Sequence, residues 1–291
     1  MPDVGKSEGK MRKYSVLDIE KKQFGGLETL FPGWDGKNER LLVYSPHDDD
    51  AIIGAGYAMR AALDDGAEVH IIIVCSGNCG YSTPEQKDSI VETRRREALA
   101  CYKAFDIPEE NIIFMGYSDF SALNYIGWNI SPEHEGHFRR SITELRKRRI
   151  TRMLVPNHYH EHVDHIAAYM MGAYDAPQAG DAHTVDWAVP HAVISTAQYS
   201  VWAELDPEDA LLHHRDPALR ADTVLIANEA VEQKVDEGLA AFVSQTEIIA
   251  DLVAQRKARQ LADGRYIEVY LRIDPRPKLS FEPYKRFIEQ L

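Results

Sequence analysis

Residues 40–75 read RLLVYSPHDDDAIIGAGYAMRAALDDGAEVHIIIVC, and they place a helical pattern between two apolar runs. The runs, at 40–45 and 68–75, are short and largely apolar, which is typical of strands that are buried on both faces. Residues 51–65 carry apolar side chains at helical spacing, and Gly66 follows where a helix C-terminus is expected. The stretch therefore predicts a strand–helix–strand unit with a right-handed crossover and two parallel strands.

The same alternation of apolar runs and helical patterns continues along the chain. We expect further helices over 84–105, 132–148, about 162–174 and about 228–260, and further strands over 111–115, 152–156, 191–199, 221–226 and 266–272. Repeated βαβ units predict an α/β, Rossmann-like fold with a mainly parallel sheet and helices on both faces. The later strands and the long helix are expected as C-terminal additions to the same domain.

The chain carries no internal repeat and no low-complexity linker, so one domain is expected over residues 39–275. Residues 1–38 are polar and weakly patterned, and we expect an N-terminal extension that packs loosely on this domain. Residues 276–291 are expected to form a C-terminal tail.

Composition excludes several classes of partner. The chain has 291 residues, with 33 Lys and Arg against 46 Asp and Glu, which gives a net charge of −13. A nucleic acid or an anionic membrane surface requires clustered positive charge, so neither is expected as the main partner. A small neutral substrate remains compatible with this charge.

The sequence also bears on location. No window holds the roughly 18 consecutive apolar residues of a membrane span, and the first residues lack the apolar core of a signal peptide. Three cysteines, Cys75, Cys79 and Cys101, are too few for a disulfide framework. We expect a reduced, cytoplasmic protein, and a homo-oligomer is left open.

Two polar segments follow predicted strands directly. The first is SPHDDD, residues 45–50, and the second is NHYHEHVDH, residues 157–165. Four of the 12 histidines fall within residues 158–165. Because ligands bind beyond the carboxyl ends of parallel strands, both segments are candidates for one site.

Histidine and carboxylate at these spacings suit a metal ion. Zinc takes N and O donors, and a catalytic zinc site has three protein ligands and one open position. His47 and Asp50 are three residues apart at a strand-to-helix turn, as are His162 and His165 in the second segment. One His–Asp pair with one distant histidine makes a three-ligand site. The alternatives are an acidic helix N-terminus at residues 48–50 and an exposed histidine-rich loop.

These residues resemble the signature pair of the PIG-L / LmbE-like family of zinc-dependent N-acetylglucosaminyl deacetylases. The family patterns are His-Pro-Asp-Asp-Glu and His-Pro-Asp-His, against HDDDA at 47–51 and HVDH at 162–165 here. Further similar segments keep the family order over roughly 40–272: Ser76-Gly77, Arg94 to Glu97, Phe114 to Asp119, Lys234 to Gln245, and Glu268 to Tyr270.

The resemblance implies roles for the first segment and its partner histidine. His47, Asp50 and His165 would bind Zn²⁺ or another divalent transition metal. Asp49 would be the general base that takes a proton from water at the metal.

The remaining roles concern the substrate. The resemblance implies that His162 stabilises the oxyanion or protonates the leaving amine, and that Asp164 orients an imidazole. Arg94 would help to hold the substrate. Some members place a tyrosine two residues before the first histidine of the second motif, so His160 and the adjacent Tyr159 are expected at the substrate.

The implied activity is hydrolysis of a linear amide, with removal of an acetyl or related acyl group from an amino sugar or glycoconjugate. Three positions depart from the family patterns, namely Asp48 and Val163 in place of proline and Ala51 in place of glutamate. The lost glutamate leaves two alternatives open: an active deacetylase, or a non-catalytic metal- or sugar-binding protein of the same fold. A nucleotide-binding protein is disfavoured because no Gly-x-Gly-x-x-Gly pattern follows the first strand.

Overall fold

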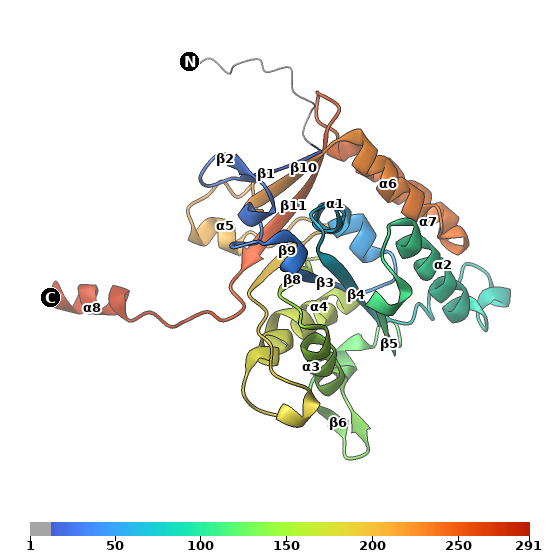
Figure 1. Cartoon of the computed structure of the whole chain (residues 1–291), viewed down its shortest axis with the longest axis horizontal. Helices are drawn as coiled ribbons and strands as arrows, with labels where there is room; N and C mark the ends of the chain where they lie inside the picture. The colour runs from blue at the N-terminus through green and yellow to red at the C-terminus, as the bar shows by residue number, and fades with distance from the viewer. Residues whose placement is uncertain (1–12) are drawn as a thin grey trace.

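The computed structural model describes residues 13–291, and within them a nine-stranded sheet forms the centre of the molecule (Figure 1). Its strands are β1 (Tyr14–Asp18), β2 (Gln23–Gly25), β3 (Arg40–Ser45), β4 (Glu68–Cys75), β5 (Ile112–Tyr117), β8 (Arg152–Pro156), β9 (Ser195–Tyr199), β10 (Thr223–Ala227) and β11 (Tyr266–Ile273). They are ordered β2-β1-β10-β11-β9-β8-β3-β4-β5. A separate hairpin contains β6 (Asn129–Ser131) and β7 (His134–Glu135).

The α-helices lie between and after these strands. They are α1 (Asp50–Asp64), α2 (Ile90–Ala104), α3 (His137–Arg148), α4 (Val163–Met170), α5 (Glu208–Leu212), α6 (Glu229–Leu239), α7 (Thr246–Arg256) and α8 (Glu282–Glu289). A π-helical turn over Met171–Asp175 extends α4.

The Rossmann-like α/β fold is confirmed, and its parallel half contains β9, β8, β3, β4 and β5. Chain order runs from β3 outward through β4 to β5, and then returns to β8 on the other side of β3. The sheet therefore has its topological switch point between β3 and β8. Ligands of doubly wound sheets bind beyond the carboxyl ends of the strands at such a point.

Both faces of the parallel half are covered, which explains its continuous apolar runs. Leu41 and Val43 of β3 belong to a core shared with α1, α2 and α6, whereas Leu42 and Tyr44 belong to a core shared with α3 and α4. Successive side chains of a strand point to opposite faces, so one run serves two cores.

The other half of the sheet is antiparallel, so the sheet is more mixed than the sequence predicts. β11 pairs with β9 and β10, β10 pairs with β1, and β1 pairs with β2. Residues 14–18 are thus part of the sheet, and Leu27, Leu30 and Phe31 are buried. This corrects the loosely packed extension expected for residues 1–38, of which residues 1–12 lie outside the described part.

The long helix expected over 228–260 is two helices, α6 and α7. The chain turns between them at buried Phe242, and Glu97 of α2 accepts hydrogen bonds from the backbone N–H and the hydroxyl of Ser244. Gln245 donates to the carbonyl oxygen of Gly80. These contacts replace helical hydrogen bonds, and they attach the turn to the loop that follows β4.

The C-terminal segment differs from the body. Helix α8 follows an extended segment that leaves the sheet after β11 (Figure 1), and its side chains are exposed. The domain boundary at residue 275 stays a prediction. In residues 13–291, no helix combines the length and the apolar character needed to cross a membrane.

Helix α1, which begins at the first polar segment, is interrupted at Ala55, where the backbone is not helical. The interruption frees the carbonyl oxygen of Ile53, which accepts hydrogen bonds from Arg256 and Arg259. Arg256 is 1% exposed and also donates to both carboxylate oxygens of Glu232, at 2.9 and 2.6 Å. The bend in α1 is therefore supported by a buried ion pair.

We expect Arg256→Ala to lower the free energy of unfolding by about 3–5 kcal/mol, because Glu232 would remain buried without its partner. Urea unfolding measures this change. Arg265→Ala removes a more exposed pair with Asp263 and should cost less than about 1 kcal/mol. Similar losses in both variants would contradict the role of the buried pair.

Candidate functional site

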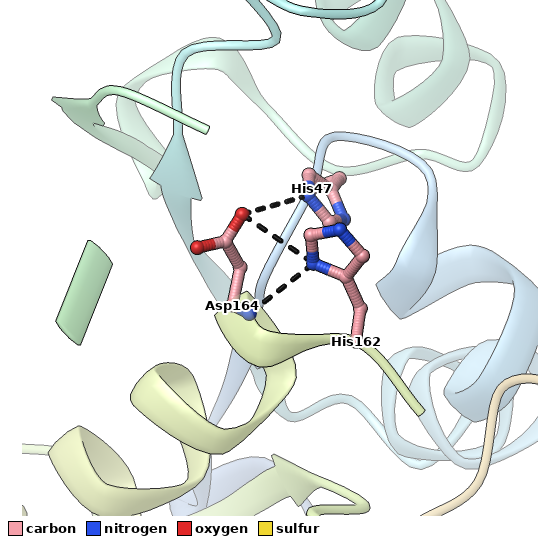
Figure 2. Close-up of side chains that lie close together, drawn as sticks. All are labelled: His47, His162 and Asp164. Carbon is pink, nitrogen blue, oxygen red and sulfur yellow. Dashed lines mark hydrogen bonds and ion pairs between the residues drawn. The ribbon is translucent and has the colours of Figure 1, made fainter. Parts of the chain in front are cut away.

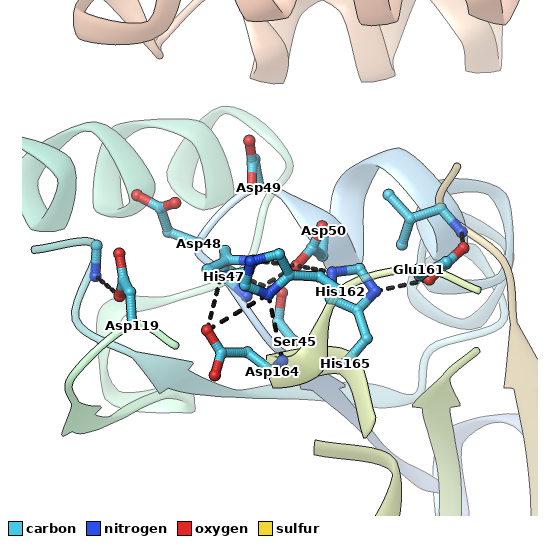
Figure 3. A network of polar contacts seen from close by, with 12 residues as sticks. Ser45, His47, Asp48, Asp49, Asp50, Asp119, Glu161, His162, Asp164 and His165 are labelled. Carbon is cyan, nitrogen blue, oxygen red and sulfur yellow. Dashed lines mark hydrogen bonds and ion pairs between the residues drawn. The ribbon is translucent and has the colours of Figure 1, made fainter. Parts of the chain in front are cut away.

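The two polar segments meet at the switch point of the sheet. SPHDDD runs from the last residue of β3 to the first residue of α1, and NHYHEHVDH runs from the end of β8 into the first turn of α4. The strands β3 and β8 are parallel neighbours, with Val43 opposite Leu154. Their carboxyl ends therefore lie at the same edge. The predicted convergence of segments about 115 residues apart occurs in the structure (Figure 3).

His47, Asp50 and His165 form a compact cluster. The Oδ2 atom of Asp50 lies 3.1 Å from Nδ1 of His47 and 3.2 Å from Nε2 of His165. The side chains of Asp50 and His165 are fully buried, yet Asp50 Oδ1 and His165 Nε2 have no hydrogen-bond partner. Buried polar atoms without partners are costly. Two imidazoles and one carboxylate, with an unpartnered atom on Asp50 and one on His165, fit a zinc-type cation.

A carboxylate also lies behind each of these imidazoles. Nε2 of His47 is 3.4 Å from Oδ2 of Asp164, and Nδ1 of His165 is 2.6 Å from Oε2 of Glu161 (Figure 3). Metal-binding histidines usually donate their second N–H to such a group, which fixes the tautomer. This arrangement leaves one nitrogen of each ring directed at Asp50.

A second group, His47, His162 and Asp164, also has donor atoms close enough for a cation (Figure 2). In this group Nδ1 of His162 already accepts a hydrogen bond from the backbone N–H of Asp164, at 3.2 Å. Asp164 in turn accepts from the backbone N–H groups of Phe120 and Ala122. Because these atoms have partners, we assign the cation to His47, Asp50 and His165.

The carboxylates control the charge of the cluster. Burial by itself would lower the pKa of His47, but hydrogen bonds to Asp164 and Asp50 raise that pKa well above its ordinary value. In the same way, Asp50 and Glu161 overcome burial and raise the pKa of His165 to about 9. Protons therefore balance the buried carboxylates in the cation-free protein, and a bound cation would displace them.

Asp49 differs from its neighbour Asp50. It precedes α1, and its carboxylate is directed away from that of Asp164 and lines a cavity (Figure 3). Burial and the charges of Asp50 and Asp48 raise the pKa of Asp49 to about 7, against the opposing effect of Arg94. A carboxylate with a pKa near neutrality is suited to proton exchange.

The cavity has a volume of about 230 Å³ and opens beside the cluster. Its lining includes the polar side chains of His47, Asp49 and His162 and the exposed apolar side chains of Phe120, Trp202 and Ile248. Burial and the nearby His47 lower the pKa of His162. His162 is therefore a neutral imidazole at neutral pH.

Arg94 lines the cavity, but its guanidinium is already paired. It donates from Nε and Nη2 to the two carboxylate oxygens of Asp48, and both side chains are buried. Gly77 and Gly80 lie against the same side chain, and an added Cβ at Gly80 would overlap the guanidinium. Arg94 therefore chiefly neutralises Asp48, and its expected contribution to substrate binding stays a prediction.

Tyr159 and His160 do not line this cavity. Their rings contact each other in a tilted arrangement, with centroids 4.2 Å apart, and Arg220 lies over the Tyr159 ring. His160 is exposed and has a positive φ of 54°, so the chain turns here before it reaches Glu161. The structure therefore places both residues outside the lining of this cavity, and their expected place at the substrate stays a prediction.

Two residues of the site have contacts that the sequence motifs did not reveal. Glu161 contacts His165, and only its spacing of four residues from that histidine could have suggested this. Asp119 accepts hydrogen bonds from the backbone N–H groups of Gly77 and Cys79, at 2.8 and 2.9 Å. It shapes the loop that borders the cavity.

The assignment of the cation predicts different outcomes for the two histidines of the second segment. Zinc at about 100 times its Kd should stabilise the wild-type protein by about 2.7 kcal/mol. This stabilisation should be lost in His165→Ala and kept in His162→Ala, as measured by thermal unfolding with and without zinc. Loss in His162→Ala alone would favour the second group of donors.

Comparisons with known proteins were consistent with this site. A family model described as PIG-L, GlcNAc-PI de-N-acetylase, matches residues 42–174. No curated protein sequence matches the chain.

Three solved structures share the fold. The conserved protein TT1542 from Thermus thermophilus has a TM-score of 0.58 and 20% identity, covering 82% of this chain and 96% of that one. N,N'-diacetylchitobiose deacetylase from Pyrococcus horikoshii has a TM-score of 0.58 and 17% identity, and the match covers 86% of this chain and 91% of that one. The 4-carboxy-2-hydroxymuconate hydratase from Pseudomonas putida KT2440 has a TM-score of 0.56 and 17% identity, and the match covers 83% of this chain and 99% of that one. The residues that match the PIG-L family model, 42–174, contain both HDDD and HVDH, so the family model covers the two segments of this site.

Proposed function

We propose that this protein is a metal-dependent deacetylase that removes an acetyl or related acyl group from an amino sugar or a glycoconjugate. The observation that carries the proposal is the cluster of His47, Asp50 and His165 beside a cavity that Asp49 also lines. The family description, which names a de-N-acetylase of a GlcNAc conjugate, supports the same reaction. A non-catalytic role is less favoured, since Ala51 leaves these ligands and the proposed base in place.

The donor set of two imidazoles and one carboxylate favours zinc or a neighbouring transition metal. Such a cation, when bound, would polarise an amide carbonyl and lower the pKa of a nearby water. The remaining chemistry depends on side chains of this chain. The bound cation is part of this proposal. The cytoplasmic location stays a prediction.

Asp49 is the proposed general base. Its carboxylate would accept a proton from a water molecule in the cavity as the water oxygen attacks the amide carbonyl carbon. The same carboxyl group would then return the proton to the departing nitrogen, so that the C–N bond breaks to give a carboxylic acid and an amine. A pKa near 7 allows Asp49 both to accept the proton from water and to return it to the departing nitrogen.

His162 is the proposed donor to the oxyanion. Its Nδ1 accepts the backbone N–H of Asp164, so the proton of the neutral ring resides on Nε2. A fixed donor of this kind stabilises the negative charge that develops on the carbonyl oxygen. Between the two roles expected for His162, the lowered pKa favours stabilisation of the oxyanion over protonation of the amine.

The exposed side chains around the cavity bear on the substrate. Phe120 is 65% exposed and Trp202 is 47% exposed, and both line the cavity that Asp49 and His162 share. Aromatic side chains can stack on the apolar face of a sugar or contact an acyl chain. A sugar that carries an N-acyl group fits this combination of polar and apolar side chains.

The proposal predicts the behaviour of Asp49→Asn. Asparagine keeps the size of the side chain but cannot accept the proton, so kcat should fall by about 10²–10⁴-fold. Acetate release from a panel of N-acetylglucosamine conjugates measures the activity, and metal analysis should show unchanged zinc content.

A control separates this reaction from others that the fold supports. Since a hydratase shares the fold, the same wild-type sample should be offered an unsaturated carboxylic acid. Hydration of that acid without amide hydrolysis would overturn the proposed function. Full deacetylase activity in Asp49→Asn would exclude Asp49 as the base.

A further inference from the structure

We infer that Glu161 is a positioning residue that sets the metal-binding tautomer of His165 and couples this ligand to the Trp202 loop, residues 200–203. This inference rests on the metal site of the proposed function, and not on the identity of the substrate. Glu161 lies in the loop before α4, and its side chain is fully buried. A buried carboxylate requires partners for both of its oxygen atoms.

One oxygen contacts the metal ligand. Oε2 of Glu161 is 2.6 Å from Nδ1 of His165, a ring whose Nε2 is directed at Asp50. An ionised carboxylate only accepts hydrogen bonds, so Nδ1 must carry the proton. The lone pair of the neutral ring is then on Nε2, where the cation would bind.

The other oxygen holds the loop. Oε1 accepts hydrogen bonds from the backbone N–H groups of Val201, Trp202 and Ala203, each at 3.0 Å. The Trp202 ring in turn lies against the His165 ring, with centroids 5.1 Å apart. Glu161 therefore joins a ligand on α4 to an aromatic side chain that lines the cavity.

Glu161→Gln separates the two contacts. The amide oxygen can replace Oε1 toward the three N–H groups, which leaves the NH₂ group facing Nδ1 of His165. That group only donates, so Nδ1 becomes the acceptor and the ring proton moves to Nε2. The opposite orientation of the amide would place its donors against three backbone donors. The variant should therefore keep the loop and lose the correct tautomer.

We expect Glu161→Gln to weaken zinc binding by about 10–100-fold, as measured by equilibrium dialysis with metal analysis. Cobalt(II) absorption should report the changed ligand in the same variant. Thermal unfolding of the cation-free proteins shows that the variant is folded at the temperature of the measurement.

Asn157→Ala is the matched control. The Asn157 side chain holds the same loop by donating to the carbonyl oxygens of Ala203 and Glu204, at 3.3 and 3.1 Å, and it contacts none of the three proposed ligands. Its loss should change zinc affinity by less than about threefold, against the 10–100-fold expected for an outer partner of a ligand. An equal loss of zinc affinity in Glu161→Gln and Asn157→Ala, or a wild-type zinc affinity in Glu161→Gln, would overturn the inference.

The tautomer of His165 can also be measured in the wild-type protein, which does not depend on the folding of a variant. In the zinc-loaded protein, ¹⁵N NMR of the His165 ring should show a protonated Nδ1 and a coordinated Nε2, and the reverse assignment would overturn the inference. Zinc binding with this pattern, but without deacetylation of any conjugate, would overturn the proposed function and leave the role of Glu161 intact.

Discussion

The parallel pairing of β3 with β8 is the constraint on which the site depends. It makes these strands neighbours at the switch point of the sheet, so the loops after their carboxyl ends occupy the same edge. HDDD and HVDH are far apart in the chain, and neither contains a complete set of ligands. Burial of β3 on both faces fixes its register, because a shift by one residue would exchange the side chains of the two cores.

The site concentrates negative charge in a small buried volume. Asp50, Asp164 and Glu161 surround two imidazoles, and Asp49 lies beside them. Buried carboxylates are unfavourable without partners, and here the imidazoles of His47 and His165 supply the partners, whose protons a bound cation would replace. Asp48 adds another charge, which Arg94 neutralises. The charge introduced by the departure from the family pattern at position 48 is thus compensated inside the protein.

Fold and reaction are separate questions for this protein. A deacetylase and a hydratase both share its fold at similar TM-scores, so architecture alone does not select hydrolysis. The chemical groups of the site distinguish these reactions better than the fold does. Under the proposed function, a zinc-type donor set, an acid with a pKa near 7 and an imidazole with a lowered pKa would together support the attack of water on a polarised carbonyl. Phe120, Trp202 and Ile248, which are exposed and line the same cavity, would offer an apolar surface to an acyl or sugar group under the proposed function.

The sequence by itself determined the strands and helices of the parallel half, the two segments of the site and their family, because apolar periodicity and short motifs are local properties. Only the tertiary structure decided which side chains meet. It placed residues 14–18 in the sheet, paired Arg94 with Asp48, turned Tyr159 and His160 away from the cavity, and set Glu161 between His165 and residues 201–203. Apart from the contact of Glu161 with His165, which lies four residues away, these contacts join residues about 40 or more positions apart or depend on the turn at a single backbone angle. No local pattern encodes either, since a buried polar group takes whichever partner the fold brings to it.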